Sequence, residues 1–228
     1  MSSRSIAAFS IETKLSRHHA SLSIWFRNAT ISFMVRSNRR SSKESVAELV
    51  TQLGRYAYGE ASAAGGLTPA QWTALRYFSR ANRFSRTVSV FAEFHATTRG
   101  TASQTVKGLV EEGYLERTPS PLDGRSSQLD VTPKAVGILT DDPFLRLIRA
   151  ADSLSATAQL TVTRALDRLL GELARELRKP TFGTCKHCRH LYSDSCCLQG
   201  QSPYRCTSLN EPLTEPEIEQ LCVNFELS

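Results

Sequence analysis

The sequence predicts a mainly α-helical fold with one small β-hairpin, extended by a short cysteine-rich segment. Apolar residues recur at three- and four-residue spacing from about residue 45 to residue 179, as they do on the buried faces of helices. The pattern changes to alternation only in residues 114–131, where proline, aspartate and glycine separate two short runs, as is typical of a hairpin. All six cysteines follow residue 184, so the end of the chain has a composition of its own.

Composition and charge divide the chain into three parts. The 228 residues are 40% hydrophobic and 22% charged, which fits a globular protein. The sequence contains no run of about 18 apolar residues, so we predict no membrane span. The net charge of +6 is concentrated in residues 1–43, which hold eight lysines and arginines and one acid. We predict a basic, disordered arm over residues 1–43, a folded domain over 44–180 and a cysteine-rich segment over 181–228.

The basic arm allows other interpretations. Its charge suits contact with nucleic acid, whereas its serine and arginine content resembles that of a transit peptide. Translation could instead begin at Met34, in which case the preceding residues would not belong to the working protein. The clustered cysteines fit a metal site in a reducing compartment better than disulfides, so we expect a cytoplasmic protein with no membrane partner.

Local signals place the first three helices. One is expected over residues 45–64 and is ended by two glycines. The second begins at Thr68, because Pro69 and Gln71 complete a helix-start signal, and a third is expected over residues 87–96. The residues of these two helices that we expect in the core are Trp72, Leu75, Phe78, Val90, Phe91 and Phe94.

A fourth helix is expected from Thr101, as its N-cap, to Gly113. Val106, Leu109 and Val110 form its apolar side and leave short polar side chains on the other. Such side chains can approach base edges in the DNA major groove, and glutamine can pair with adenine. An ordinary amphipathic surface helix would show the same pattern.

The hairpin brings a basic residue beside this helix. Strands are expected over residues 114–118 and 127–131, and Arg125 lies near the tip, with Asp123 placed to hold the turn. Such a unit can put a helix into the major groove and an arginine into the neighbouring minor groove, although a solvated loop arginine is the alternative. The candidate DNA-binding residues are Thr101, Ser103, Gln104, Thr105, Lys107, Asp123 and Arg125.

The helices after the hairpin predict association. Thr132 and Pro133 start one helix, residues 141–143 interrupt it, and Ser155 starts a long helix. The long helix has one continuous apolar face, which it cannot bury alone. The helix over residues 45–64 is its expected partner, either within a monomeric bundle or across a dimer. The face consists of Leu160, Thr163, Leu166, Leu169, Leu170, Leu173 and Leu177.

The order of these elements, over about residues 45–179, resembles the MarR family of winged-helix transcriptional regulators. The residues that carry the resemblance are Leu67–Trp72, Thr105–Arg117, Asp123–Ser126 and Leu129–Ala135. The resemblance implies a winged helix-turn-helix fold and a homodimer joined by its first and last helices. It also implies palindromic double-stranded DNA as the partner, with the fourth helix in the major groove and Arg125 in the minor groove. Many members release DNA on binding a small aromatic acid or on cysteine oxidation, but no residue here identifies such a ligand.

The chain departs from the family pattern at four places. The stretch Asn82–Arg86 replaces a shorter polar turn, Ala135 stands where glycine is frequent, and residues 141–143 break a helix. The largest departure is the cysteine-rich segment, for which the ordinary family has no counterpart.

That segment predicts a metal centre. A Cys-x2-Cys pair presents two thiolates from one turn, so Cys185 and Cys188 are expected to bind one metal with two of the other cysteines. A segment this poor in apolar residues needs a metal or disulfides to fold. Zinc, an iron–sulfur cluster and metal-free thiol chemistry all remain open, and His187 and His190 are expected to face solvent. The candidate ligands are Cys185, Cys188, Cys196, Cys197, Cys206 and Cys222, the last at the end of a short helix over residues 215–221.

We therefore predict a sequence-specific DNA-binding regulator that senses metal, iron–sulfur status or redox state through its C-terminal cysteines. The sequence shows no nucleophile–base–acid set, no glycine-rich phosphate loop and no paired catalytic carboxylates, so we expect no enzyme activity. Two alternatives are a small iron–sulfur redox protein on a helical scaffold and a zinc-stabilised protein-interaction module.

Overall fold

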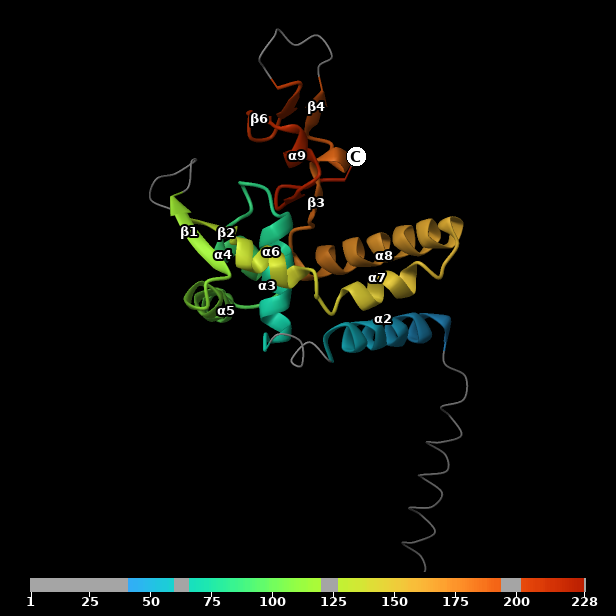
Figure 1. The fold of residues 1–228 in the computed structure, drawn as a ribbon. Helices are drawn as coiled ribbons and strands as arrows, with labels where there is room; N and C mark the ends of the chain where they lie inside the picture. The colour runs from blue at the N-terminus through green and yellow to red at the C-terminus, as the bar shows by residue number, and fades with distance from the viewer. Residues whose placement is uncertain (1–40, 60–65, 120–126, 194–201, 228) are drawn as a thin grey trace, which may run out of the picture. The chain divides into compact units, whose positions relative to one another are not determined.

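The computed structural model describes residues 41–59, 66–119, 127–193 and 202–227 (Figure 1). The chain divides into two compact units, residues 1–52 and 53–228. The boundary falls inside helix α2 (Ser42–Gly59). Of the predicted basic arm, residues 1–40 lie outside the described part of the chain.

Helix α2 begins three residues before the predicted start. Its first turn is capped reciprocally, because the backbone N–H of Ser41 donates to Glu44 Oε2 at 2.8 Å and the backbone N–H of Glu44 donates to Ser41 Oγ at 3.4 Å. Its apolar side chains are exposed, with Leu49 at 64% and Tyr56 at 74%. The predicted end of this helix, at residues 60–65, lies outside the described residues.

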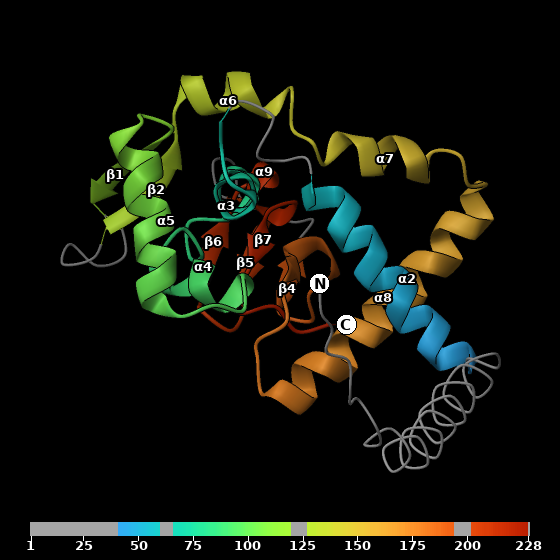
Figure 2. The ribbon, with the colours of Figure 1, turned by 90° about the horizontal axis from the view of Figure 1, so that it is seen from below.

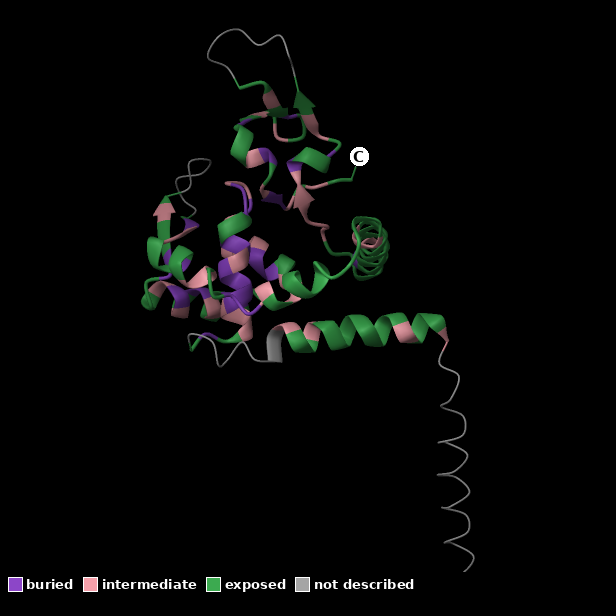
Figure 3. Ribbon diagram, turned by 45° about the vertical axis from the view of Figure 1, so that its right-hand side comes forward, coloured by how far each residue is buried: buried purple, intermediate pink, exposed green. Residues whose placement is uncertain are grey.

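The winged-helix core is built from α3 (Pro69–Arg80), α4 (Val88–Phe94), α5 (Arg99–Glu111), β1 (Leu115–Pro119), β2 (Ser127–Val131) and α6 (Pro133–Leu139). Helix α3 is its centre and carries the largest run of buried residues (Figure 3). Trp72, Leu75 and Phe78 are each about 1% exposed or less, so the predicted core face of this helix is confirmed. The capping box of Thr68 and Gln71 is also present.

Two predicted helix ends are wrong. The N-cap of α5 is Thr98 and not Thr101, because Thr98 Oγ1 accepts from the backbone N–H of Thr101 at 3.2 Å. Helix α4 ends at Phe94 and not at residue 96, where Ala96 has a left-handed φ of 50°. Phe94 was expected to be buried and is instead 36% exposed.

The hairpin of β1 and β2 forms in the predicted place, with Leu115 opposite Val131 and Arg117 opposite Leu129. Leu115 and Leu129 are buried in the core, 2% and 0% exposed. Arg86 also fixes β2, because its guanidinium donates to Asp130 Oδ1 at 2.6 Å and its backbone oxygen accepts from Leu129 at 2.9 Å. The base of the hairpin is therefore held by the core on one side and by the loop before α4 on the other.

Residues 141–143, where the predicted helix is interrupted, are held to helix α3 by side-chain contacts. The carboxylate of Asp142 is 5% exposed and accepts from Arg76 of α3 at 2.7 Å and from the backbone N–H of Phe144 at 2.8 Å. The guanidinium of Arg76 also lies 5.0 Å from the centroid of the Phe144 ring. This group joins the start of α7 (Leu145–Ala151) to the core.

Helix α8 (Ala156–Leu177) is capped by Ser155, as predicted, and ends at Arg178 in a left-handed conformation. Ala174 is its one buried residue. The predicted apolar face is exposed along the helix in a single chain (Figure 3). The exposed leucines are Leu160, Leu166, Leu169, Leu170, Leu173 and Leu177, at 41–61%.

The C-terminal segment contains two small antiparallel sheets (Figure 2). Strand β3 (Gly183–Thr184) pairs with β7 (Leu221–Cys222), and β4 (Leu191–Ser193), β5 (Tyr204–Cys206) and β6 (Glu211–Leu213) form the other sheet. A 3-10 turn, η2 (Cys185–His187), and a short helix, α9 (Glu215–Ile218), complete it. The helix predicted over residues 215–221 thus ends at Ile218, and Cys222 lies on a strand.

Gly183 is required by a close approach to Phe225. A Cβ atom at Gly183 would lie 2.7–2.8 Å from three carbons of the Phe225 ring. We expect Gly183→Ala to lower the free energy of unfolding by about 1–3 kcal/mol, because the ring must move out of its packed position. Gly171→Ala in α8, where no atom lies within 4 Å of the added Cβ, is the control and should not destabilise. Urea denaturation of both variants checks this, and equal stability would contradict the close approach.

Within the described residues, no helix has both the length and the apolar character needed to cross a membrane.

Candidate nucleic-acid interface and cysteine cluster

Helix α5 has one buried side and one exposed polar side. Ala102, Val106 and Leu109 are buried against the core, whereas Ser103, Gln104 and Lys107 are exposed. Thr101 is exposed, and Thr105 is half-buried with its hydroxyl donating to the backbone oxygen of Thr101 at 3.2 Å. The structure thus places the predicted face of α5 at the surface, with Gln104 and Lys107 available to a partner.

Both ends of α5 are fixed to the fold. At its start, the cap of Thr98 satisfies a backbone donor that has no partner inside the helix. At its end, Gln71 of α3 donates to Glu112 Oε1 at 3.2 Å, and Lys134 Nζ donates to the backbone oxygen of Glu112 at 2.6 Å. A helix held at both ends keeps its exposed side chains at defined positions, as recognition of base edges requires.

Basic groups near α5 come from positions that the sequence argument did not single out. Arg99, in the first turn of α5, and Arg117, on β1, are both exposed, and Arg117 donates to Ser127 Oγ at 3.3 Å. Lys107 lies 3.7 Å from Glu111, both well exposed, a pair worth little in water. Only the fold shows that Arg99 and Arg117 both lie near the exposed polar side of α5. Asp123 and Arg125, the predicted wing residues, lie outside the described residues.

Four cysteines come together in the C-terminal segment. Cys185, Cys188, Cys206 and Cys222 are free thiols, and each is buried, at 4–8% exposure. They line one cavity of about 10 Å³ together with His190, Leu191, Leu213 and Asn224. Cys196 and Cys197, the other two predicted ligands, lie outside the described residues. The structure therefore brings together thiols that are up to 37 positions apart in the sequence, as the spacing Cys185 to Cys222 shows.

The thiols interact with one another. A hydrogen bond between Cys185 and Cys222 raises the pKa of the Cys185 thiol, and burial raises it further. The same bond lowers the pKa of the Cys222 thiol to about 6, and hydrogen bonds from Asn82, Ser85 and the backbone of Asn224 also lower it. Burial raises the pKa of the nearby Tyr77 phenol, and the charge of Cys222 adds to this effect.

The two histidines of the segment differ in exposure and in the residues that they contact. His187 is exposed, as predicted, and its Nδ1 lies 3.1 Å from Thr184 Oγ1. His190 is less exposed than predicted, because its side chain is 21% exposed, lines the thiol cavity and lies 3.2 Å from Glu226. Among the described residues, no group of three or more histidine, cysteine, aspartate and glutamate side chains is already arranged as a metal-binding site.

The stretch Asn82–Arg86 docks the cysteine segment onto the winged helix. The backbone N–H of Asn82 donates to Leu221 at 2.9 Å, and Ser85 Oγ accepts from the backbone N–H of Val223 at 3.0 Å. Arg83 donates to Glu217 at 2.5 Å and to the backbone oxygen of Pro212 at 2.7 Å. The departure from the family pattern was visible in the sequence, but its docking role was not.

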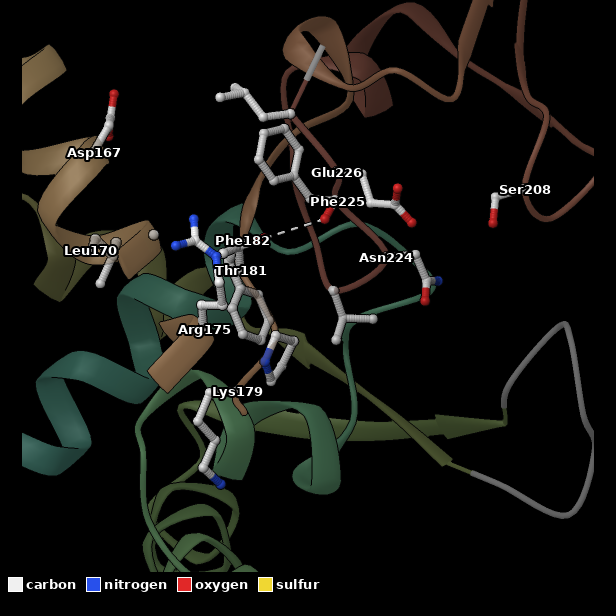
Figure 4. A pocket seen from close by; sticks show the side chains of 14 residues that line it. Asp167, Leu170, Arg175, Lys179, Thr181, Phe182, Ser208, Asn224, Phe225 and Glu226 are labelled. Atoms are coloured by element: carbon white, nitrogen blue, oxygen red, sulfur yellow. Dashed lines mark hydrogen bonds between the residues drawn. The ribbon is translucent and has the colours of Figure 1, made fainter. Parts of the chain in front are cut away.

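A second cavity, of about 660 Å³, lies beside the C-terminal half of α8 (Figure 4). Arg175 and Lys179 line it together with Phe182 and Phe225. Arg175 pairs with Glu172, and Lys179 lies 3.5 Å from Glu93, so both cations already have acidic neighbours. A small aromatic effector of this protein stays a prediction.

The comparisons with known proteins agree with the fold. Residues 65–126 match the sequence model of the MarR family. A DNA complex of MepR from S. aureus is 16% identical and covers 60% of this chain and 99% of its own, with a TM-score of 0.50. A probable transcriptional regulator from Pseudomonas aeruginosa is 23% identical over 57% of this chain and 99% of its own, with a TM-score of 0.42. Sco3205 from Streptomyces coelicolor, a MarR family regulator solved with DNA, is 19% identical over 59% and 94%, with a TM-score of 0.48. No curated protein matches the chain by sequence.

These matches leave about two fifths of the chain unaccounted for, including the cysteine-rich segment. The residues that match the family model carry α3, α4, α5 and β1. Residues 65–126 are therefore similar to the MarR family of transcriptional regulators, and the C-terminal cysteine-rich segment lies outside the matched residues.

Proposed function

We propose that the protein is a homodimeric regulator that binds duplex DNA, with α5 in the major groove and the hairpin tip against the neighbouring minor groove. The observation that carries this proposal is the exposed polar face of α5, formed by Ser103, Gln104 and Lys107 opposite a fully buried side. An α-helix fits the major groove and reads base edges through such side chains. MepR and Sco3205, which share the fold, have been solved with DNA.

The apolar face of α8 supports a dimer. Six leucines on one face of α8 are each 41–61% exposed. They form a continuous apolar stripe that a single chain leaves in contact with water. A stripe of this kind on one long helix matches a second copy of itself, since an isologous contact uses the same patch twice. Two α5 helices brought together in this way would read a palindromic site.

The test of DNA binding is a series of titrations of the full chain with a palindromic duplex selected from a random library. We expect Lys107→Ala and Arg125→Ala each to weaken binding and to reduce the slope of log affinity against log salt by about 1, because each loses one phosphate contact or groove contact. Lys186→Ala, an exposed lysine of the C-terminal segment, is the matched control. If all three variants bound equally at every salt concentration, the assignment of α5 and the hairpin would be wrong.

We further propose that the chemical state of the C-terminal cysteines changes the affinity of the protein for DNA. Two contacts, joined by the chain between Asn82 and Arg83, support this path. Asn82 Nδ2 lies 3.9 Å from Cys185 Sγ, Asn82 begins the docking stretch, and the backbone oxygen of Arg83 in that stretch accepts from Gln128 of β2 at 2.6 Å. A change in the thiol cluster can therefore displace the strand that leads to the hairpin tip.

A measurement on the unmodified protein tests this regulatory step. We would compare the affinity for the selected duplex before and after blocking the buried thiols with a small alkylating reagent. Weaker or stronger binding after blocking supports the path, and unchanged binding with complete modification of the four thiols contradicts it.

A further inference from the structure

The four described cysteines occupy positions that converge from separate turns and strands. Cys185 lies in η2 and Cys188 follows it, with the backbone N–H of Cys188 donating to the Cys185 oxygen at 2.9 Å. This tight turn presents both thiols to one side. Cys206 ends β5 in one sheet and Cys222 lies on β7 in the other, so the cluster joins all parts of the segment.

We propose that Cys185, Cys188, Cys206 and Cys222 bind a single zinc ion per chain as a tetrahedral thiolate site. Four thiolates satisfy the usual coordination of a structural zinc site. On binding, each of the four cysteines that still carries a proton releases it to solvent, and four zinc–sulfur bonds form. The hydrogen bond between Cys185 and Cys222 is then replaced by coordination. The four thiols line one cavity but are not yet placed as metal ligands, so zinc binding requires them to move closer to one centre.

The surroundings of the sulfur atoms suit thiolates. The backbone N–H of Glu226 donates to Cys188 Sγ at 3.5 Å, and Asn82 Nδ2 donates to Cys185 Sγ at 3.9 Å. Backbone and side-chain donors of this kind orient ligands and stabilise their negative charge. The carboxylates nearest in sequence, Glu219 and Glu226, are exposed and pair with Lys186 and Arg189.

The cavity between the four thiols is small. The cavity that the four thiols line is about 10 Å³, which is close to the volume that a single water-sized probe occupies. A space of this size suits one ion, and an iron–sulfur cluster of several atoms needs a larger one. The geometry therefore favours zinc over the iron–sulfur alternative.

The segment has only a small buried core of its own. Its buried cluster consists of Cys185, Cys206 and Cys222 with Leu213 and Ile218, so cysteines make up most of it. A domain this small seldom folds on such a core without a metal or disulfides. The four described cysteines are free thiols, which leaves the metal as the crosslink.

The experiment is metal analysis of the full chain purified under reducing conditions. We expect one zinc per chain in the wild type and after Cys196→Ser or Cys197→Ser, which serve as matched controls. Cys188→Ser and Cys206→Ser should each retain at least tenfold less zinc after dialysis against a competing chelator. The proposal would be overturned if the wild type held no zinc, or if it held iron with inorganic sulfide. It would also be overturned if the control variants lost zinc as completely as Cys206→Ser.

A second measurement does not depend on the variants folding. Thiol titration of the native wild type before and after removal of zinc should differ by four thiols per chain. Cobalt in place of zinc should give the intense visible absorption of a tetrahedral tetrathiolate site. A difference of two thiols, or a cobalt spectrum typical of octahedral oxygen ligands, would contradict the assignment. Both readouts are independent of DNA, so the metal site can fail while the DNA-binding function stands, and the reverse.

Discussion

Replacing Leu169 and Leu173 by aspartate is expected to convert the protein to a monomer and to abolish tight binding to a palindromic duplex. Both side chains are largely exposed in one chain, at 44% and 50%, so the monomer itself should keep its fold. In the proposed dimer they are buried, and two charges on each copy would face the same charges on the other. Loss of the second DNA-binding unit should lower the affinity by about 100-fold or more.

Sedimentation analysis and duplex titration measure the two parts of this prediction. The matched control is Thr161→Asp with Arg168→Asp, two exposed positions on the opposite side of α8 by helical spacing. The control should remain dimeric. If the leucine variant also stayed dimeric, the apolar face of α8 would not be the interface, whatever the fate of DNA binding.

Arg83→Ala is expected to loosen the attachment of the cysteine-rich segment to the winged helix. Arg83 bonds to Glu217 at 2.5 Å and to the oxygen of Pro212 at 2.7 Å, and its guanidinium lies 4.6 Å from the Phe84 ring. The Glu217 side chain is 12% exposed, so the variant leaves a nearly buried carboxylate without its cationic partner, although Thr214 still donates to its other oxygen. We expect a loss of roughly 2–4 kcal/mol, below the value for a fully buried pair because Arg83 is partly exposed.

Thermal unfolding and proteolysis of the folded protein check this prediction. Lys186→Ala is the matched control, since Lys186 also pairs with a glutamate of the segment, Glu219, but both side chains are more than half exposed; it should change little. Because the Arg83 backbone also holds β2 through Gln128, duplex affinity should fall about five- to tenfold. Unchanged proteolysis and unchanged affinity would show that the docking stretch does not couple the two parts.

Much of the fold could be predicted from residues that act on their immediate neighbours in the sequence. The starts of α3, α6 and α8 follow from Thr68, Thr132 and Ser155, each of which caps its helix as the sequence predicted. A cap acts within three residues, so its signal is readable without knowing the fold. The misplaced cap of α5 has the same origin, since Thr98 and Thr101 are equally good candidates by type, and only the preceding turn selects Thr98.

The candidate sites were less evenly predictable. The exposed face of α5 follows from its apolar period, because Val106 and Leu109 must be inside and Gln104 and Lys107 then cannot be. The roles of Asn82 and Arg83 could not be predicted, because their partners Cys185 and Glu217 lie more than 100 positions away. The anchoring of Asp142 by Arg76, 66 positions away, is hidden in the same way.

By itself the sequence determined the resemblance to a family of winged-helix regulators, the helix and hairpin of the proposed DNA-binding unit, and the presence of a separate cysteine-rich end. These depend on periodicity, caps and turns, which act over a few residues. Only the tertiary structure decided which thiols converge and how their segment is tied to the winged helix through residues 82–86. Those features are contacts between distant parts of the chain, and such contacts follow from packing as a whole, which leaves no local pattern in the sequence.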